Sequence, residues 1–191
     1  QLAQDKDREP IDVTDLLDRV ARENMRTAGV VDIAVDADDD LGTVWGWPGG
    51  LRLAVDNLVR NAATHGDATR VVLSGHRKAD RIEIIVDDDG AGLPVEERGV
   101  VLGRFARGST AAPGGSGLGL ALVTQQADLH GGGLELSDSP IGGLRATLTI
   151  PVAAPLDPDA TIPVKTGTEP WRRRANRVAG WRSSGMQPPQ S

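Results

Sequence analysis

The sequence contains no cysteine, which excludes disulfide bonds and thiolate metal sites and is compatible with a reducing cytosol. It also has no apolar run near the length of about 18 residues that a membrane-spanning helix needs. The N-terminal residues QLAQDKDREP are charged and lack the apolar core of a secretory signal peptide. Because an initiator methionine is missing as well, we expect the chain to be a segment of a longer protein.

Positive charge is scarce over most of the chain. The net charge is −6 at pH 7, but residues 154–191 carry six Lys/Arg against three Asp/Glu, which leaves −9 on residues 1–153. Such an acidic body argues against general binding of nucleic acid, whose phosphates require a basic surface. With 39% hydrophobic and 25% charged residues among 191, the composition is ordinary for a globular domain.

Proline separates two parts of the chain. Residues 154–191 hold six of the 12 prolines and little apolar periodicity, which predicts a largely disordered tail. An alternative for part of this tail is a short helix starting near Thr168, with Trp171 and Trp181 on one face, that docks on a partner or an acidic membrane. We therefore predict a folded domain over residues 1–153 and a Pro/Arg-rich tail over residues 154–191.

The folded part mixes helical and strand periodicity. Helices are expected at about 14–27, 51–65 and 117–130. Strands are expected at about 10–13, 30–35, 42–46, 70–76, 81–87, 134–136 and 146–150. Residues 88–116 have little periodicity and many glycines, which is typical of a functional or disordered loop. Because strict βαβ alternation is absent, the pattern predicts an α+β fold with one mixed sheet and helices on one face.

Three polar residues follow one line along the expected helix at 51–65. Asn57, Asn61 and His65 are spaced by four positions, beside the apolar stripe that would pack on the sheet. Asparagine is a mediocre helix former, so two of them within a helix need a reason. Amide oxygens suit Mg²⁺, and a following imidazole could reach a phosphate or a ribose. The alternative is that all three side chains face water.

An aspartate follows the strand expected at 81–87. Asp88 precedes Gly90 and Gly92, whose missing side chains permit unusual backbone conformations and let a flat ligand come close. A carboxylate can accept a hydrogen bond from the amino group at N6 of adenine, where guanine presents a carbonyl. Asp88 therefore suits adenine, and a plain Asp-Gly turn is the alternative.

Glycines crowd the stretch GGSGLGLAL at 114–122, where the last expected helix begins. The first N–H groups of a helix lack intrahelical partners and carry the positive end of its dipole, so bare backbone there favours a phosphate. A P-loop would need lysine where Leu120 stands, and the spacing G-x-G-x-G differs from that of the dinucleotide-binding fingerprint. A flexible hinge is the alternative.

The order of these motifs is more specific than any one of them. NLVRNAATH, DDDGAGL, GRFARG and GGSGLGLAL resemble, in this order, the N box, first glycine box, F box and second glycine box of bacterial sensor histidine kinases. Their ATP-binding catalytic domain belongs to the GHKL superfamily, with gyrase, Hsp90 and MutL. The resemblance covers roughly residues 10–152, and SGLGLALVTQQADLHGG is similar to mycobacterial kinases of the PrrB type. It implies the Bergerat ATP-binding fold: a two-layer α/β sandwich with a mixed, mostly antiparallel five-stranded sheet and three helices on one face.

The resemblance also implies roles for individual residues. Asn61 would ligate the Mg²⁺ that bridges the ATP phosphates, Asn57 would stand beside it, and His65 would lie near the ribose or α-phosphate. Asp88 would bind adenine N6. The remaining implied ATP-binding residues belong to the adenine pocket (Gly90, Gly92), to the mobile lid (Arg104, Phe105, Arg107) and to the second glycine box (Gly115, Ser116, Gly117, Leu118, Gly119).

The implied reaction is transfer of the γ-phosphate of Mg-ATP to a histidine on a dimerisation domain, for relay to a response regulator. The sequence offers His65, His76 and His130, and none is followed by the Glu-Leu-Arg of the usual acceptor run. The acceptor is therefore expected upstream of residue 1, in a homodimeric kinase anchored in the cell membrane. The present chain would be its cytoplasmic part, monomeric by itself and without affinity for nucleic acid.

Other members of the superfamily supply the alternatives. Hydrolysis as in gyrase-like relatives is disfavoured, because those carry glutamate at the position of Asn57 and an amide cannot act as a base. An anti-sigma-factor-type serine protein kinase and a non-catalytic nucleotide-binding docking module stay open. Thr124 stands where many relatives carry a basic residue, so Mg²⁺, the helix N-terminus and the lid arginines would have to meet the phosphate charge.

Overall fold

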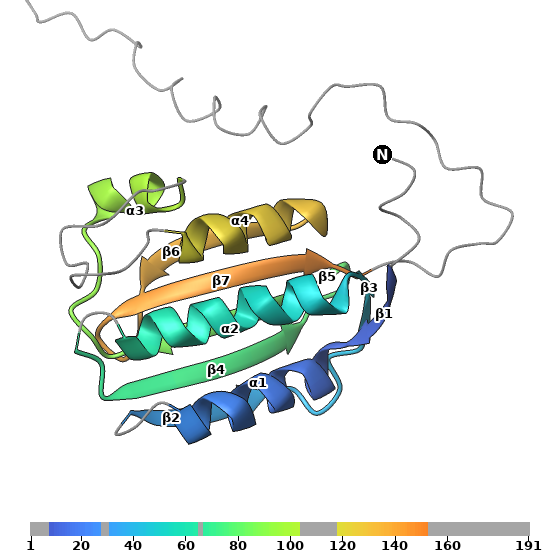
Figure 1. Ribbon diagram of the computed structural model, residues 1–191, viewed down its shortest axis with the longest axis horizontal. Helices are drawn as coiled ribbons and strands as arrows, with labels where there is room; N and C mark the ends of the chain where they lie inside the picture. Colours follow the sequence, from blue (N-terminus) through green and yellow to red (C-terminus); the bar gives the residue numbers. More distant parts are fainter. Residues whose placement is uncertain (1–7, 28–30, 65–66, 104–117, 153–191) are drawn as a thin grey trace, which may run out of the picture. The chain divides into compact units, whose positions relative to one another are not determined.

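The main sheet has five strands in the order β2–β4–β5–β7–β6 (Figure 1). A computed structural model describes residues 8–27, 31–64, 67–103 and 118–152. In sheet order, the strands span Asp32–Ala37, Arg70–Arg77, Arg81–Asp88, Leu144–Pro151 and Gly133–Asp138. β2 pairs with β4 in parallel, and the other neighbours are antiparallel. The predicted mixed, mostly antiparallel five-stranded sheet is confirmed.

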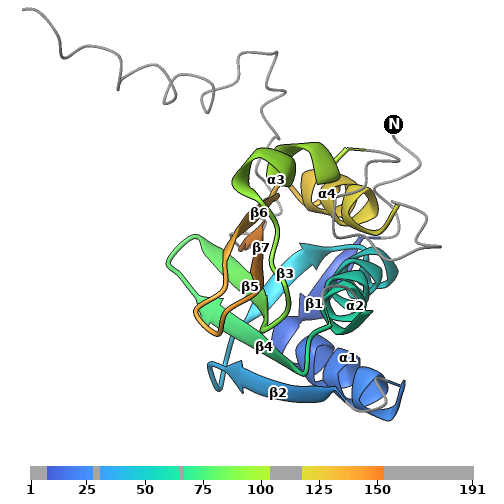
Figure 2. The same cartoon turned by 90° about the vertical axis from the view of Figure 1, so that its left-hand side faces the viewer.

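Three helices cover one face of this sheet, as predicted (Figure 2). They are α1 (Val13–Thr27), α2 (Pro48–Thr64) and α4 (Gly119–Leu129). The described residues contain a fourth helix, α3 (Val95–Val101), inside the stretch for which no periodic element was expected. This corrects the predicted helix count. With seven residues, of which only Val101 is buried, α3 is too short to leave an amphipathic period in the sequence.

Two of the expected strands stay outside the main sheet. β1 (Glu9–Asp12) and β3 (Thr43–Gly46) pair with each other in a separate antiparallel sheet. The expectation of one sheet from the strand pattern is therefore wrong for these two strands. Alternation marks a strand but does not name its partner. The small sheet ends where α1 begins. There the N–H of Val13 donates to the carbonyl of Gly42, the residue before β3, at 3.2 Å.

The predicted tail, residues 154–191, lies outside the described residues. The tail and its boundary therefore stay predictions. No helix within the described ranges is both long and apolar enough to pass through a membrane.

α2 is held to the sheet by the apolar stripe that the sequence predicts. The stripe consists of Leu51, Ala54, Val55, Leu58 and Ala62, all of them buried. α2 packs there against β4 and β5. Each Å² of apolar surface removed from water contributes roughly 25 cal/mol to the free energy of folding, so burial of these side chains fixes which side of α2 faces the core. The partly exposed Asn57 and Asn61 are left on another edge of the helix.

One face of β5 bears a row of buried apolar side chains that leads to the predicted site. Ile82, Ile84 and Val86 face the helices and are buried in the core. Because side chains alternate along a strand, Asp88 lies on the same face at the end of this row. Its exposed fraction is only 7%. The period of the strand therefore places a carboxylate at the end of an apolar row.

Asp87 lies on the opposite face of the sheet and pairs with Arg145 of β7. Arg145 donates from Nε to Oδ1 at 2.8 Å and from Nη2 to Oδ2 at 2.7 Å. This hydrogen bonding raises the pKa of Arg145. The Asp87 carboxylate is buried, whereas Arg145 is partly exposed. This bidentate ion pair links β5 to β7 next to Asp88.

Arg145→Met should lower the free energy of unfolding by about 2 kcal/mol. Removing one partner of a buried ion pair costs about 3–5 kcal/mol, and the loss is smaller here because water reaches the partly exposed Arg145 side. Urea denaturation at neutral pH measures the change. Adding Asp87→Leu should restore more than half of it, because no charge is then left buried. A single-variant loss below about 0.5 kcal/mol would contradict this role of the pair.

Candidate functional site

The last turn of α2, the end of β5 and the start of α4 lie at the same end of the folded part (Figure 1). β5 ends there at Asp88, whose neighbour across the sheet is Val71 near the start of β4. α2 ends at Thr64 above these strands, and α4 begins beside it at Gly119. A carboxylate on the sheet and an uncapped helix start are thus brought to the same end of the molecule by segments far apart in the sequence.

Asp88 uses one carboxylate oxygen within the protein. Oδ1 accepts the main-chain N–H of Gly90 at 2.9 Å and that of Leu144 at 3.1 Å. The first bond is the local Asp-Gly turn that the sequence left as an alternative, but the second spans 56 positions. Burial raises the pKa of Asp88, and the two N–H donors oppose that rise. No hydrogen bond from the described residues reaches Oδ2, which is therefore an oriented spare acceptor.

Gly143 is a site residue that the sequence analysis missed. A Cβ atom at this position would collide with Oδ1 of Asp88 and lie 2.5 Å from the main-chain nitrogen of Gly90. The N–H of Gly143 also donates to the Asp88 carbonyl at 3.0 Å. Only glycine lets the β6–β7 turn press against the end of β5 and deliver the N–H of Leu144. The one signal in the sequence is the doublet at 142–143, which by itself indicates no more than a turn.

Asp89 has a structural task instead. It accepts the hydroxyl of Thr69 at 2.6 Å, the N–H of Thr69 at 2.8 Å and the N–H of Arg70 at 2.9 Å. These bonds, led by the Thr69 hydroxyl, lower the pKa of Asp89. Since Asp87 is occupied by Arg145, Asp88 alone among the three consecutive aspartates has an oxygen left for a ligand.

The two glycines after Asp88 differ in what they require. Gly92 has φ = +70°, in the left-handed region that L side chains rarely adopt. Gly90 has no such conformation, and its contribution is the N–H that binds Asp88. Their predicted part in shaping an adenine pocket stays a prediction.

Asn61 lies against the first residue of α4. A Cβ atom on Gly119 would be 3.1 Å from both Nδ2 and Oδ1 of Asn61, tighter than most such contacts. The missing side chain of Gly119 is what lets the two helices approach here. The side chains of Asn57 and Thr64 bond back to the main chain of α2, but Asn61 makes no such bond among the described residues. Its amide is thus available beside the start of α4.

Asn57 lies one turn earlier on α2. Its Nδ2 donates to the carbonyl of Leu53 at 2.8 Å, so the amide donor is used within the helix. Only its oxygen stays available as a ligand atom.

α4 begins without a side-chain cap. Its N-cap residue is Leu118, and the first main-chain bond of the helix runs from the N–H of Leu122 to the carbonyl of Leu118 at 2.9 Å. The N–H groups of the first turn therefore lack intrahelical partners and carry the positive end of the dipole. Thr124 is neutral and brings no positive charge to this helix start, and its hydroxyl donates to the carbonyl of Leu120 at 3.0 Å within the helix.

Half of the predicted site residues lie outside the described residues. They are His65, Arg104, Phe105, Arg107, Gly115, Ser116 and Gly117. Among the residues that are described, no group of three or more His, Asp or Glu side chains could hold a metal ion. A divalent cation at this site would therefore need ligands other than a cluster of these side chains.

Comparison with known proteins gives consistent matches. Residues 47–154 match the family described as histidine kinase-, DNA gyrase B-, and HSP90-like ATPase. The chain is 49% identical over 151 residues to the sensor-type histidine kinase PrrB of Mycobacterium tuberculosis, which covers 79% of this chain and 34% of PrrB. It is 40% identical over 138 residues to the histidine-protein kinase/phosphatase MprB of Mycolicibacterium smegmatis, covering 71% of this chain and 28% of MprB.

A solved structure agrees with the sequence matches. The ATP binding domain of PrrB from Mycobacterium tuberculosis has a TM-score of 0.68 and 44% identity, over 78% of this chain and 100% of that one. The present chain spans about a third of the length of the PrrB kinases that it matches.

Asp88→Asn should raise the free energy of unfolding near neutral pH. Because burial raises the pKa of Asp88 above the ordinary 3.8, the folded protein binds this proton more tightly than the unfolded chain. Stability then falls as the pH rises from that ordinary value through the raised one. Asparagine removes this cost, and its oxygen still accepts from Gly90 and Leu144. Chemical denaturation should show this gain in the free energy of unfolding at about pH 7 and no gain near about pH 3.5.

Asp89→Asn is the matched control, with the opposite sign. The lowered pKa of Asp89 contributes stability that is present above the ordinary value of 3.8 and is lost as the pH falls through the lowered one. This variant should therefore be less stable than the unchanged protein at neutral pH. Changes of the same sign at both positions would contradict the separate tasks assigned to the two aspartates.

Proposed function

This chain belongs to the family of histidine kinase-, DNA gyrase B-, and HSP90-like ATPases, and on that premise we propose that it is the ATP-binding catalytic domain of a two-component sensor histidine kinase. The spare, oriented oxygen of Asp88 carries this proposal. The contact between Asn61 and Gly119 supports it from the phosphate side. The similarity to PrrB and MprB, both named as histidine kinases, supports the kind of reaction.

Asp88 would recognise the adenine base. Its Oδ2 would accept a hydrogen bond from the N6 amino group, which favours the ionised carboxylate and offsets the cost of its burial. Guanine presents a carbonyl at this position, so two acceptors would face each other. Gly90 and Gly92 would let the flat ring lie close to the backbone.

Asn61 and the first turn of α4 would hold the phosphate end. The Asn61 amide oxygen fits Mg²⁺, a cation that takes few protein ligands and completes its shell with phosphate oxygens and waters. Bound Mg²⁺ supplies charge neutralisation on the phosphates. The N–H groups in the first turn of α4 would donate to phosphate oxygens, and the Asn57 oxygen would stand beside Asn61.

Residues outside the described ranges complete the proposed site. Arg104 and Arg107 would meet phosphate charge that Thr124 does not, and Phe105 would anchor the lid. His65 would lie near the ribose or α-phosphate. Gly115, Ser116 and Gly117 would bring bare backbone to the phosphates.

The proposed reaction moves the γ-phosphoryl group from ATP to an imidazole nitrogen: one P–O bond breaks and ADP leaves, one P–N bond forms, and the imidazole N–H proton passes to an acidic side chain beside the acceptor histidine. Catalysis of this step consists mainly of alignment and charge neutralisation. The described histidines do not fit the acceptor. His130 is buried with both ring nitrogens hydrogen-bonded, and Nδ1 of His76, a residue of β4, lies 3.5 Å from Oδ1 of Asp38. The acceptor histidine would therefore be on a dimerisation domain outside this chain.

Asn57 favours transfer to a histidine over hydrolysis. Its neutral amide cannot take a proton from water, and its Nδ2 is already committed to Leu53. The full-length protein would be a homodimer anchored in the membrane, with this domain in the cytoplasm. Its partners would be the upstream dimerisation domain and a response regulator.

Asp88→Asn should weaken Mg-ATP binding by roughly a hundredfold. An amide N–H₂ would then face the N6 donor, and a hydrogen bond to a charged group contributes about 1.5–3 kcal/mol. Isothermal titration calorimetry measures the affinity. Because this variant is expected to be more stable than the unchanged protein, a loss of binding would not come from unfolding.

Asn61→Ala should weaken Mg-ATP binding roughly tenfold and leave adenosine binding unchanged, because only the phosphate end loses a ligand. Leu53→Ala, an exposed position on the same helix, is the control and should change neither affinity. Unchanged Mg-ATP binding in both Asp88→Asn and Asn61→Ala would refute the site assignment.

Mixing the chain with the dimerisation domain of its own kinase and Mg-ATP should label a histidine. The label should be lost in acid and kept in alkali, because it is a phosphoramidate, and the chain alone should stay unlabelled. An acid-stable label on serine would favour the anti-sigma-factor type of kinase. Nucleotide binding without any transfer would favour a docking module.

A further inference from the structure

His130 joins α2 and α4 at the end remote from Asp88. Its Nδ1 donates to the carbonyl of Gln126, one turn back on α4, at 2.7 Å. Its Nε2 accepts the main-chain N–H of Trp47, the residue before α2, at 3.1 Å. This assignment of donor and acceptor is the neutral Nδ1–H tautomer. The imidazole is thus a bridge from the last turn of one helix to the beginning of the other.

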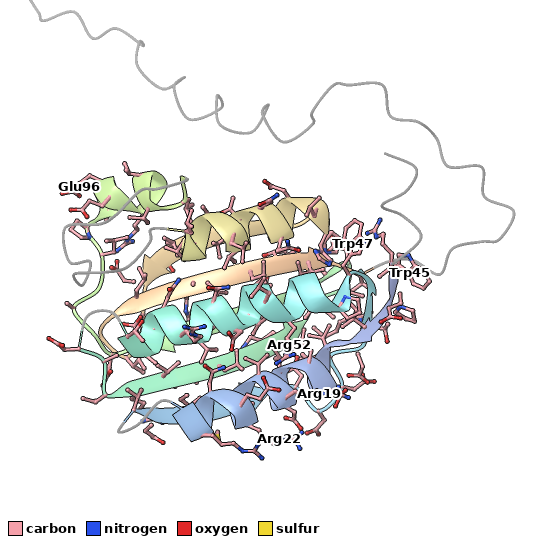
Figure 3. The ribbon with its side chains drawn as sticks, viewed as in Figure 1. Arg19, Arg22, Trp45, Trp47, Arg52 and Glu96 are labelled. Atoms are coloured by element: carbon pink, nitrogen blue, oxygen red, sulfur yellow. The ribbon has the colours of Figure 1, made fainter. Side chains whose placement is uncertain are left out.

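The bridge is closely enclosed. His130 is 5% exposed, and a Cβ atom on Gly46 would overlap its ring. The Trp47 ring meets it edge-on, with the two centroids 5.5 Å apart, and the Arg8 guanidinium lies 4.8 Å from the Trp47 ring centroid. Figure 3 shows Trp47 at this end of α2. With its ring confined in this way, His130 holds one fixed distance between the two helix ends.

The opposite ends of the same two helices form the proposed phosphate site. Asn61 follows Trp47 by 14 residues, which is about 20 Å along a helix. There Asn61 lies against Gly119, where even an added methyl group would be only 3.1 Å from its amide. The two helices are antiparallel, so the start of α4 lies beside the end of α2 (Figure 1). Because a helix shifts along its axis as a unit, a slide of α4 at the His130 end moves Gly119 relative to Asn61 by the same amount.

We propose that His130 is a positioning residue for phosphate binding: by accepting the Trp47 N–H, it sets the axial register of α4 on α2 and so places the first turn of α4 beside Asn61. The inference rests on the proposed function and adds to it a residue that touches no ligand. Adenine recognition lies on β5 and the β6–β7 turn, so it should not depend on this bridge.

Two amide variants separate the bridge from the fold. In His130→Gln, the longer side chain can place an oxygen near the position of Nε2 and accept from Trp47. In His130→Asn, the amide reaches only the position of Nδ1 and keeps the bond to Gln126. Binding of Mg-ATP by calorimetry and of adenosine by NMR titration is compared for both variants and the unchanged chain, with urea denaturation reporting their stability.

His130→Asn should weaken Mg-ATP binding roughly tenfold, within the range usual for remote coupling, and leave adenosine binding unchanged. His130→Gln should stay within about threefold of the unchanged chain for both ligands. Equal weakening of both ligands, or equal Mg-ATP affinity of the two variants, would overturn the inference. Failure of the unchanged chain to bind Mg-ATP would instead overturn the proposed function.

A measurement on the unchanged chain tests the same coupling without a substitution. Coupling between two sites is reciprocal, so bound phosphate must strengthen the bridge if the bridge strengthens phosphate binding. Mg-ATP should therefore slow hydrogen exchange at the Trp47 amide by roughly tenfold more than saturating adenosine does. The same exchange rate with both ligands would overturn the inference even if neither variant folds.

Discussion

Burial of one side of α2 against β4 and β5 is the constraint on which the candidate site depends. Because Leu51, Val55 and Leu58 must face the sheet, Asn57 and Asn61 have to follow another edge of the helix. Turning the helix by one residue would carry an asparagine amide towards the core, where an unsatisfied polar group costs several kcal/mol. The α4 helix then packs along the same edge. Apolar packing, rather than any polar contact, therefore orients the residues proposed to hold Mg-ATP.

The strand period does the same for the carboxylates at the end of β5. Three adjacent aspartates would repel one another on one face, but alternation sends Asp88 to the helix side and leaves Asp87 and Asp89 to other partners. Arg145 neutralises Asp87, and Thr69 and Arg70 satisfy Asp89. Burial raises the pKa of Asp88 and so disfavours its charged form in the protein without a ligand. Asp88, whose ionised form is disfavoured by burial, is thus also the carboxylate proposed to bind adenine.

The sequence was sufficient for whatever is local or periodic. The stripe of α2, the strand ending at Asp88 and the glycines opening α4 each leave a pattern within a few residues, and their order identified the family. Contacts made across the fold left no such pattern. The pairing of β1 with β3, the pressure of Gly143 on Asp88 and the fit of Gly119 against Asn61 all depend on segments brought together by packing. The sequence did not predict α3 for a different reason: its two turns are too few to show a helical period of apolar residues.

The placement of Trp47 determines what optical spectroscopy can report. The sequence has no tyrosine, one phenylalanine and four tryptophans, of which Trp171 and Trp181 lie beyond residue 152. A chain ending at Val152 would keep two indoles, Trp45 and Trp47, both at the end of α2 remote from Asp88 (Figure 3). Its intrinsic fluorescence would then arise far from the nucleotide. An emission change on adding nucleotide would measure communication along the helices, and a constant emission would mean that binding is felt only locally.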